Sequence, residues 1–199
     1  MKKAVKPVFH IFHNGEVAEV NYFQDFKHFL GARKAWVNVE NYYKQTKGKA
    51  PWQVVDHAIN FKNSEISEKD EDQVWCVFDV DSFLKQDPDS FLKSLKKAKE
   101  NHINIACSNP CFELWPMLHF ELIESAMSAQ DYQKKLKVLF KGIGVDYKKN
   151  CEGLFSKLLD KQTTAITRAK KISKEENIKT NPSTTVFRLV EELRKFLLN

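Results

Sequence analysis

The sequence lacks the long apolar run that a membrane-spanning helix requires. No stretch approaches about 18 consecutive apolar residues. The N-terminus also lacks the apolar core of a signal peptide, because the short apolar stretch 8–12 that follows the basic first residues is interrupted by His10. These absences predict a soluble, cytoplasmic protein without a membrane partner.

Metal-binding cysteine patterns are absent as well. The four cysteines form no Cys-x-x-Cys motif, and no His or Cys pair has the spacing of zinc ligands. They lie in apolar segments or near a predicted helix start. We interpret them as reduced thiols, so a zinc site is not expected: Cys76, Cys107, Cys111 and Cys151.

The order of apolar patterns along the 199 residues predicts an α/β protein. Strands are predicted at residues 8–12, 35–39, 74–81 and 103–107, and they alternate with helices predicted at 19–30, 51–61 and 88–100. Farther along, the periodicity is helical only, over 130–140, 154–171 and 183–198. Such an order favours a three-layer parallel sheet. We predict an α/β domain at residues 1–126 with a basic helical region, 127–199, packed on it.

The segment 74–81, Val-Trp-Cys-Val-Phe-Asp-Val-Asp, is the most informative one. Its five consecutive apolar residues indicate a strand buried on both faces, in the middle of the sheet. Within one strand, Asp79 and Asp81 project from the same face, about 7 Å apart, at the carboxyl end where α/β sheets bind ligands. Carboxylate oxygens suit Mg²⁺ or Mn²⁺. The alternative is that the two aspartates only cap the next helix or solvate a turn.

Positive charge is concentrated toward the C-terminus. Residues 133–179 contain thirteen Lys or Arg and five Asp or Glu. A basic segment beside an acidic metal site is typical of enzymes that act on nucleic acid, although lysine-rich helices also serve solubility. The candidates for holding phosphates are Lys134, Lys135, Arg168, Lys170 and Lys171.

The sequence Ser108-Asn109-Pro110 follows a predicted strand and is predicted to begin a helix. Asn109 would be its N-cap, and Pro110 would occupy the first helical position, where a missing N–H costs nothing. Pro116 should kink this helix, because its ring deprives the carbonyl of Phe112 of a partner.

Histidines offer little support for a catalytic site. His10 and His13 are three residues apart on a predicted strand, so they leave opposite faces and are interpreted as structural or surface residues. His119 lies at helical spacing from Trp115 and Phe112 and is interpreted as a packed core residue.

Four segments resemble successive signatures of the RloB family, which includes the AbiL component of phage abortive infection. They are His13-Asn14-Gly15-Glu16-Val17-Ala18-Glu19-Val20-Asn21-Tyr22-Phe23, residues 74–81, Ser108-Asn109-Pro110-Cys111-Phe112-Glu113-Leu114-Trp115 with His119-Phe120, and Asn181-Pro182-Ser183-Thr184-Thr185-Val186. That family is regarded as a variant of the TOPRIM fold, the metal-binding module of topoisomerases, primases and OLD-type nucleases. Its genes lie beside that of an AAA-type ATPase in restriction and phage-defence loci. The resemblance therefore implies a TOPRIM-like, Mg²⁺-dependent nuclease that acts on DNA or RNA together with such an ATPase.

The resemblance also implies roles for individual residues. Asp79 and Asp81 match the metal-binding Asp-x-Asp pair, and Glu19 matches the second acid of the first motif. Ser108, Asn109 and Glu113 belong to the most specific block. The family's first motif normally begins with Glu-Gly.

This chain departs from the first motif at Asn14-Gly15. Asparagine can offer a carbonyl oxygen to a metal but cannot accept a proton near neutral pH. Glu16 takes over the role of acid or base, or the protein cuts weakly, or it is a nucleic-acid-binding or regulatory subunit that does not cut. A more distant alternative is a phosphatase of the haloacid dehalogenase type, since Phe78-Asp79-Val80-Asp81-Ser82 resembles the first motif of that family, with Phe83 departing from it.

Overall fold

The computed structural model describes residues 7–15, 17–30, 35–41, 50–66, 71–148, 151–173 and 178–197, except for the side chains of Glu40, Asn41 and Ser82. The strands are β1 (Val8–His13), β2 (Trp36–Asn41), β3 (Gln73–Asp79), β4 (Asn104–Asn109) and β5 (Ser183–Thr184). The helices are α1 (Ala18–Leu30), α2 (Pro51–Glu65), α3 (Asp81–Gln86), α4 (Pro88–Glu100), α5 (Leu114–Leu118), α6 (Ala129–Lys141), α7 (Leu154–Leu158), the 3₁₀ helix η3 (Leu159–Lys161), α8 (Gln162–Ile172) and α9 (Val186–Arg194). The predicted α/β class is confirmed.

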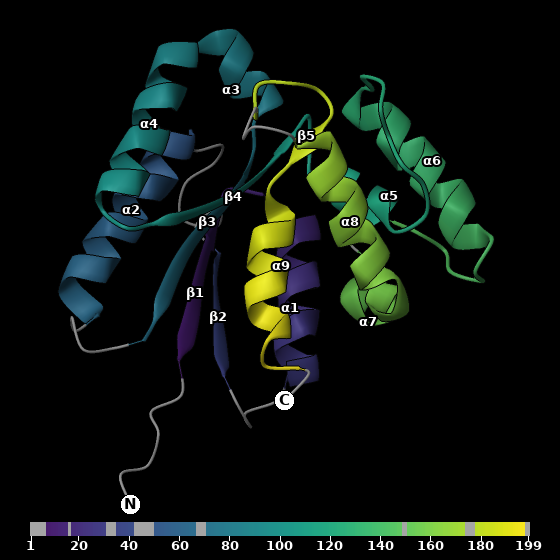
Figure 1. Ribbon diagram of the computed structural model, residues 1–199, viewed down its shortest axis with the longest axis horizontal. Coiled ribbons are helices and arrows are strands. Elements are labelled where there is room, and N and C mark those ends of the chain that lie inside the picture. The colour runs from purple at the N-terminus through teal and green to yellow at the C-terminus, as the bar shows by residue number, and fades with distance from the viewer. Residues whose placement is uncertain are drawn as a thin grey trace, which may run out of the picture.

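The strands form one sheet in the order β2-β1-β3-β4-β5 (Figure 1). The first four strands are parallel, and β5 pairs antiparallel with β4. The apolar run in β3 therefore lies in the middle of the sheet, as predicted. Parallel strands end at the same edge, so the carboxyl ends of β1, β3 and β4 lie beside one another.

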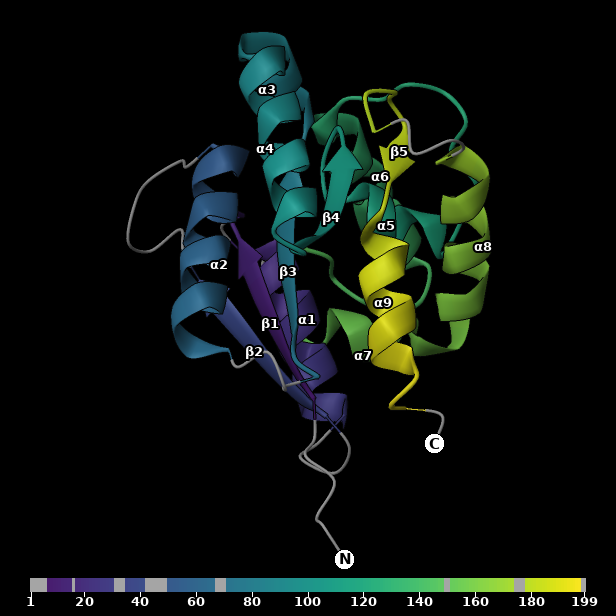
Figure 2. The same cartoon turned by 60° about the vertical axis from the view of Figure 1, so that its left-hand side comes forward.

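Helices cover both faces of the sheet and make three layers (Figures 1 and 2). Helices α2 and α4 pack on one face, and α1, α5, α8 and α9 belong to the layer on the other. The side chains of β3 alternate between two cores: Val74, Cys76 and Phe78 lie in the core under α2 and α4, and Trp75 and Val77 lie in the other. This alternation explains why the run is continuously apolar.

The prediction that the central strand continues to Asp81 is wrong. Strand β3 ends at Asp79, and Asp81 is the first residue of α3. The backbone turns at Val80, whose N–H still bonds to the carbonyl of Ser108, while its own carbonyl accepts from the N–H groups of Phe83 and Leu84. Because the chain is already helical after Val80, Asp79 and Asp81 do not share a strand face.

The predicted helix start at Asn109 is also wrong. Asn109 is the last residue of β4, its bond to Pro110 is cis, and α5 begins only at Leu114. The side-chain amide of Asn109 donates to the carbonyls of Ile178 and Lys179, so it ties two segments together and caps no helix. Pro116 lies in the first turn of the five-residue helix α5, where a missing N–H costs little. The carbonyl of Phe112 accepts from the N–H of Trp115, so the prediction that Pro116 deprives it of a partner is wrong.

The C-terminal region contributes to the sheet, which the helical periodicity did not predict. Thr184 pairs with Ser108 across β5 and β4, and the two side-chain hydroxyls lie 2.8 Å apart. The predicted helix 183–198 therefore begins later, at Val186, and the predicted helix 154–171 is divided into α7, η3 and α8. The domain boundary at residue 126 stays a prediction.

Candidate functional site

The candidate site lies at the carboxyl edge of the parallel strands, on the face that α1 covers. The register places His13 of β1 opposite Val77, and Asp79 of β3 opposite Ser108 of β4. Since side chains alternate along a strand, His13, Asp79 and Ser108 project to the same face as Val77. The side chain of Asp79 is half-buried at this edge.

Glu19 reaches the same edge from the first turn of α1. Its side chain is buried and folds back over Gly15, where an added β-carbon would collide with the Glu19 carboxylate. Glycine at position 15 therefore leaves the room that this carboxylate occupies. Asn14 is half-buried beside it, at the end of β1. Glu16, the predicted substitute for the missing glutamate, lies outside the described residues.

Glu113 is a buried acid directly before α5. Burial raises the pKa of Cys111, and the carboxylates of Glu113 and Asp79 raise it further. Burial likewise raises the pKa of Tyr147, with contributions from Glu113 and Glu19. The Glu113 side chain is 3% exposed and accepts a hydrogen bond from Gln133 (Nε2 to Oε1, 3.3 Å). The carboxylate of Glu113 thus contributes to the raised pKa of both thiol and phenol.

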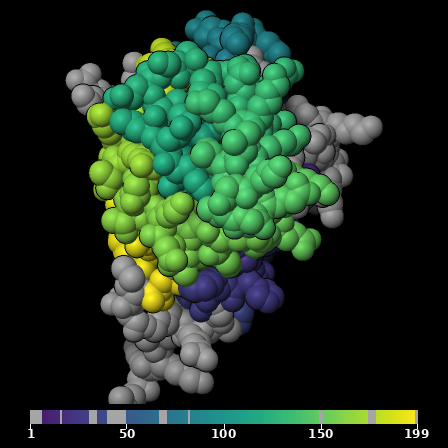
Figure 3. Space-filling view, turned by 90° about the vertical axis from the view of Figure 1, so that its right-hand side faces the viewer, coloured from purple at the N-terminus to yellow at the C-terminus, as the bar shows by residue number. Residues whose placement is uncertain are grey.

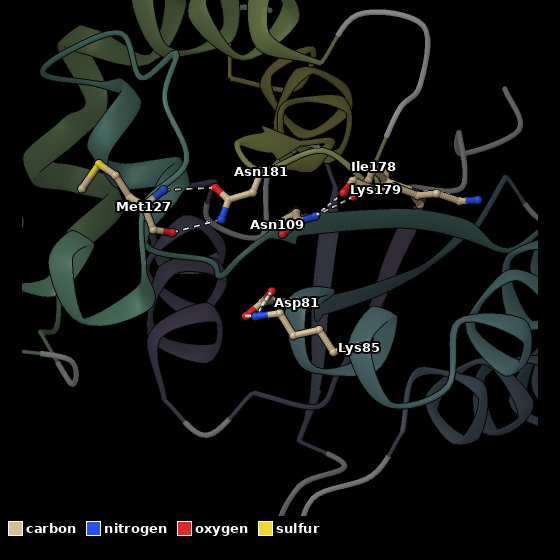
Figure 4. A network of polar contacts seen from close by, with 7 residues as sticks. All are labelled: Asp81, Lys85, Asn109, Met127, Ile178, Lys179 and Asn181. Atoms are coloured by element: carbon tan, nitrogen blue, oxygen red, sulfur yellow. Dashed lines mark hydrogen bonds and ion pairs between the residues drawn. The ribbon is translucent and has the colours of Figure 1, made fainter.

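Asp81 occupies a different position from these acids. Its carboxylate forms an ion pair with Lys85 one turn later on α3, at 2.9 Å, and its side chain is 39% exposed. The pair, which Figure 4 shows, lines a groove of about 840 Å³. The other lining residues come from the α5–α6 connection, from α6 and from the loop before β5: Ser125, Ala126, Met127, Ser128, Ala129, Asp131, Lys134, Lys135 and Asn181.

Two asparagines connect segments at and near this groove (Figure 4). The side-chain amide of Asn181 bonds to both main-chain groups of Met127: its Nδ2 donates to the carbonyl (3.0 Å), and its Oδ1 accepts from the N–H (3.4 Å). Asn109 donates to the carbonyls of Ile178 (3.2 Å) and Lys179 (3.0 Å). Figure 3 shows the side of the molecule on which the α5–α6 connection and α6 lie. The sequence signal for both clamps is an asparagine directly before a proline.

Comparison with models of protein families shows to which family the chain belongs. A family model described as RloB-like protein matches residues 9–193, from β1 to the last turn of α9. The chain belongs to the RloB-like family. No curated protein and no solved structure matches it. In the described part of the chain, no helix is long and apolar enough to cross a membrane.

The predicted phosphate-holding residues of this RloB-like protein do not form one basic surface. Lys134 and Lys135 line the groove beside Asp81, whereas Lys170 lines a separate hollow between α8 and α9. Each of the five already has a partner within the chain. The contacts are Lys134–Asp131 (4.0 Å), Lys135–Glu121 (2.9 Å), Arg168 Nη1 to the Leu118 carbonyl (2.8 Å), Lys170–Glu191 (2.6 Å) and Lys171–Glu124 (2.9 Å).

The donor set suits a metal that keeps water ligands. Among the described residues, no group of three or more His, Cys, Asp or Glu is placed to hold a metal ion by itself. Mg²⁺ is commonly held by one or two carboxylates together with waters and substrate phosphates. Asp79, half-buried at the end of β3, is a suitable carboxylate for such a site, and Glu19 approaches the same edge.

Two histidines of the RloB-like protein are buried and have structural contacts. The sequence predicted a packed core position for His119, and a structural or surface position for His13. His13 Nδ1 lies 3.0 Å from the Gly15 carbonyl, and His119 Nδ1 lies 3.0 Å from the Trp115 carbonyl. Burial lowers the pKa of each imidazole to about 4. Both rings are therefore neutral at pH 7.

We expect the free energy of unfolding to fall as the pH is lowered from about 6.5 to about 4. In that window the unfolded histidines bind protons while the folded ones remain neutral, so each contributes stability above pH 6.5 that is lost toward pH 4. A shift of this size corresponds to about 3 kcal/mol for each residue. Urea denaturation at a series of pH values would measure it, and His119→Gln should flatten the profile. An unchanged profile in that variant would contradict the assignment.

Proposed function

We propose that this RloB-like protein hydrolyses phosphodiester bonds of nucleic acid with a divalent ion, Mg²⁺ or Mn²⁺, at Asp79. The observation that carries the proposal is Asp79, half-buried at the carboxyl end of the central strand, with the buried Glu19 folded over Gly15 after the neighbouring strand β1. Two residues after Asp79, Asp81 lines a groove with three lysines. When bound, the ion would polarise a phosphoryl oxygen and stabilise the leaving group.

The residues around the groove have distinct tasks in this proposal. Lys85, Lys134 and Lys135 attract the phosphates of the strand. Their present ion pairs are exposed, and such pairs typically contribute only about 0–1 kcal/mol, so a phosphate can replace the acid at little cost. Asp81 is then released from Lys85 and lies beside the nucleic-acid strand. For this reason it belongs to the proposed site, although it is paired with Lys85 in this structure.

The wider setting is proposed from the family resemblance. It supports an AAA-type ATPase as partner, a role in phage defence such as abortive infection, and a cytoplasmic location. It also supports the TOPRIM-like character of the sheet. The five-stranded, mostly parallel order with acids at the carboxyl edge is compatible with that character.

A second candidate function is nucleic-acid binding without cleavage, as a regulatory subunit. Two observations favour it. Asn14 stands where the family has a glutamate, and Asp81 is paired with Lys85 one helix turn away from it. In this case the groove would still hold phosphates, but the acid/base group would be missing.

A cleavage assay distinguishes the two candidates. Purified protein is incubated with labelled single-stranded and duplex DNA and RNA, in Mg²⁺, in Mn²⁺ and in EDTA. The proposal expects cleavage with a divalent ion and none in EDTA, together with Mn²⁺ uptake in a calorimeter. Binding without cleavage under every condition would favour the regulatory subunit. Phosphatase activity that beryllofluoride inhibits would instead favour the haloacid dehalogenase type.

Replacing Asn14 with glutamate should increase cleavage. The variant restores a carboxylate at the end of β1, where it can accept a proton, and general acid/base catalysis typically contributes about 10²- to 10⁴-fold in rate. The initial rate on a labelled oligonucleotide measures the effect. Asn104→Glu is a matched control, because Asn104 is exposed at the opposite end of β4. If Asn14→Glu cleaves at the same rate as the wild-type protein, another group already performs this task.

A further inference from the structure

A second, smaller hollow lies on the other side of α3 from the groove. It has a volume of about 240 Å³ and is called the α3 pocket below. Helix α3 contributes to both sites: Asp81 and Lys85 line the groove, whereas Phe83 and Gln86 line the pocket. The other residues come from the first turns of α2 and α4 and the positions before them: Ala50, Pro51, Trp52, Gln53, Asp87, Ser90 and Phe91.

The α3 pocket is aromatic, and the groove is not. Trp52, Phe83 and Phe91 line the pocket, while the described residues that line the groove include no aromatic side chain. The Trp52 side chain is 46% exposed, in contrast to Trp75 and Trp115, which are buried at 4% and 0%. An indole that remains half in water at the mouth of a pocket is available for stacking against a planar ring.

The polar groups of the pocket select against a phosphate. Hydrogen bonds from Ser90 lower the pKa of Asp87, so its carboxylate is ionised and repels anions. Gln53 accepts from the N–H of Ala50 through Oε1, which leaves its NH₂ group as a donor. Gln86 adds an exposed side-chain amide. Donors and acceptors beside aromatic rings suit the polar edge of a nucleobase.

The size of the pocket limits the ligand to a small one. Pockets for drug-sized molecules have volumes of roughly 300–1,000 Å³, and this one is below that range. It has room for one planar ring system, but not for several nucleotides of a nucleic-acid strand. The groove, with about 840 Å³, has room for more of the backbone.

We infer that the α3 pocket binds one unstacked nucleobase of the nucleic acid whose backbone passes Asp81 and Lys85. The inference rests on the proposed function for the course of the backbone. The two sites are separated by the width of one helix, about 10–12 Å. A base that occupies the pocket must be free of its own duplex partner and of its neighbours' stacking, so single-stranded nucleic acid, or a strand with an unpaired base, is the substrate class.

Tryptophan fluorescence tests the inference directly. Short single-stranded DNA or RNA of mixed sequence is titrated into the protein in EDTA, where no cleavage occurs, and the same sequence is then titrated as a duplex. We expect saturable quenching by the single strand and weaker quenching by the duplex. Trp52→Phe should remove most of the quenching. Trp36→Phe, which changes a tryptophan that is 49% exposed but does not line the pocket, should retain it.

Affinity provides the second measurement. Fluorescence anisotropy of a labelled single strand should show at least about five-fold weaker binding for Trp52→Ala, the lower end of what loss of a stacking aromatic costs. Circular dichroism verifies that the variant is folded. Equal affinity of Trp52→Ala and wild type for the single strand would overturn the inference that the α3 pocket binds a nucleobase. If both proteins still cleave nucleic acid, the nuclease proposal stands. Conversely, loss of affinity in Trp52→Ala of a protein that never cleaves would support the pocket and refute the nuclease.

Discussion

Replacing Asp79 with asparagine is expected to lower the cleavage rate by more than about 100-fold. Loss of a group that only supports a metal ligand typically costs 10- to 100-fold, so loss of the ligand itself should cost more. The substitution preserves size and shape while it removes the charge. Asp79 is half-buried at the end of a central strand, where the backbone fixes the position of its carboxylate.

The measurements are the cleavage rate with Mn²⁺ and the heat of Mn²⁺ binding, and both should be lost together. Asp89→Asn is a suitable control, because Asp89 is an exposed aspartate in the first turn of α4 that lines neither the groove nor the α3 pocket. Asp81→Asn should have an intermediate effect, since that carboxylate is already neutralised by Lys85. Full activity of Asp79→Asn would end the assignment of the metal to this residue.

Replacing Trp115 with alanine is expected to destabilise the protein by about 3–5 kcal/mol, the usual cost of removing a buried Trp or Phe side chain. Trp115 has an exposed fraction of 0% and is among the largest fully buried side chains. Its ring packs edge-on against His119, with 5.0 Å between centroids, and against Tyr22, with 6.5 Å. Alanine leaves a cavity in the core between α1 and α5, on which Tyr22 and Trp115 lie.

Urea denaturation measures this loss as a shift of the midpoint with an unchanged slope. The matched control is Trp36→Ala, because the Trp36 side chain is 49% exposed and its removal creates no internal cavity. We expect the control to lie within about 1 kcal/mol of wild type. A comparable cost in both variants would show that Trp115 does not carry core stability in the way its burial indicates.

The central strand and its acid were predictable because they are local. A continuous apolar run can be satisfied only by burial on both faces, and β3 is buried in that way between α2, α4 and the opposite layer. The alternation of strands and helices similarly predicted the three layers. Asp79 therefore lies within the predicted strand segment, at the point where the observed strand ends.

The position of Asp81 was not predictable from the same pattern. Sequence alternation places it on the face of Asp79, but the carbonyl of Val80 accepts from two later N–H groups and starts a helix at this point. Likewise, Asn109 has the sequence of an N-cap, yet its amide finds acceptors at Ile178 and Lys179, about seventy residues away. Competition between local and distant hydrogen-bond partners decides such cases, and only the fold brings the distant partners near.

Sequence alone determined the α/β class, the buried central strand, the concentration of acids in the family motifs and the excess of C-terminal lysine. Tertiary structure decided which of these residues meet. It folded Glu19 over Gly15, paired the predicted lysines and the arginine with acids or a carbonyl of the same chain, and placed Trp52 and Phe83 in one pocket. The physical reason is that side-chain type and periodicity are properties of the local chain. Proximity across the sheet depends on strand order and on the turns between distant elements, which no local pattern contains.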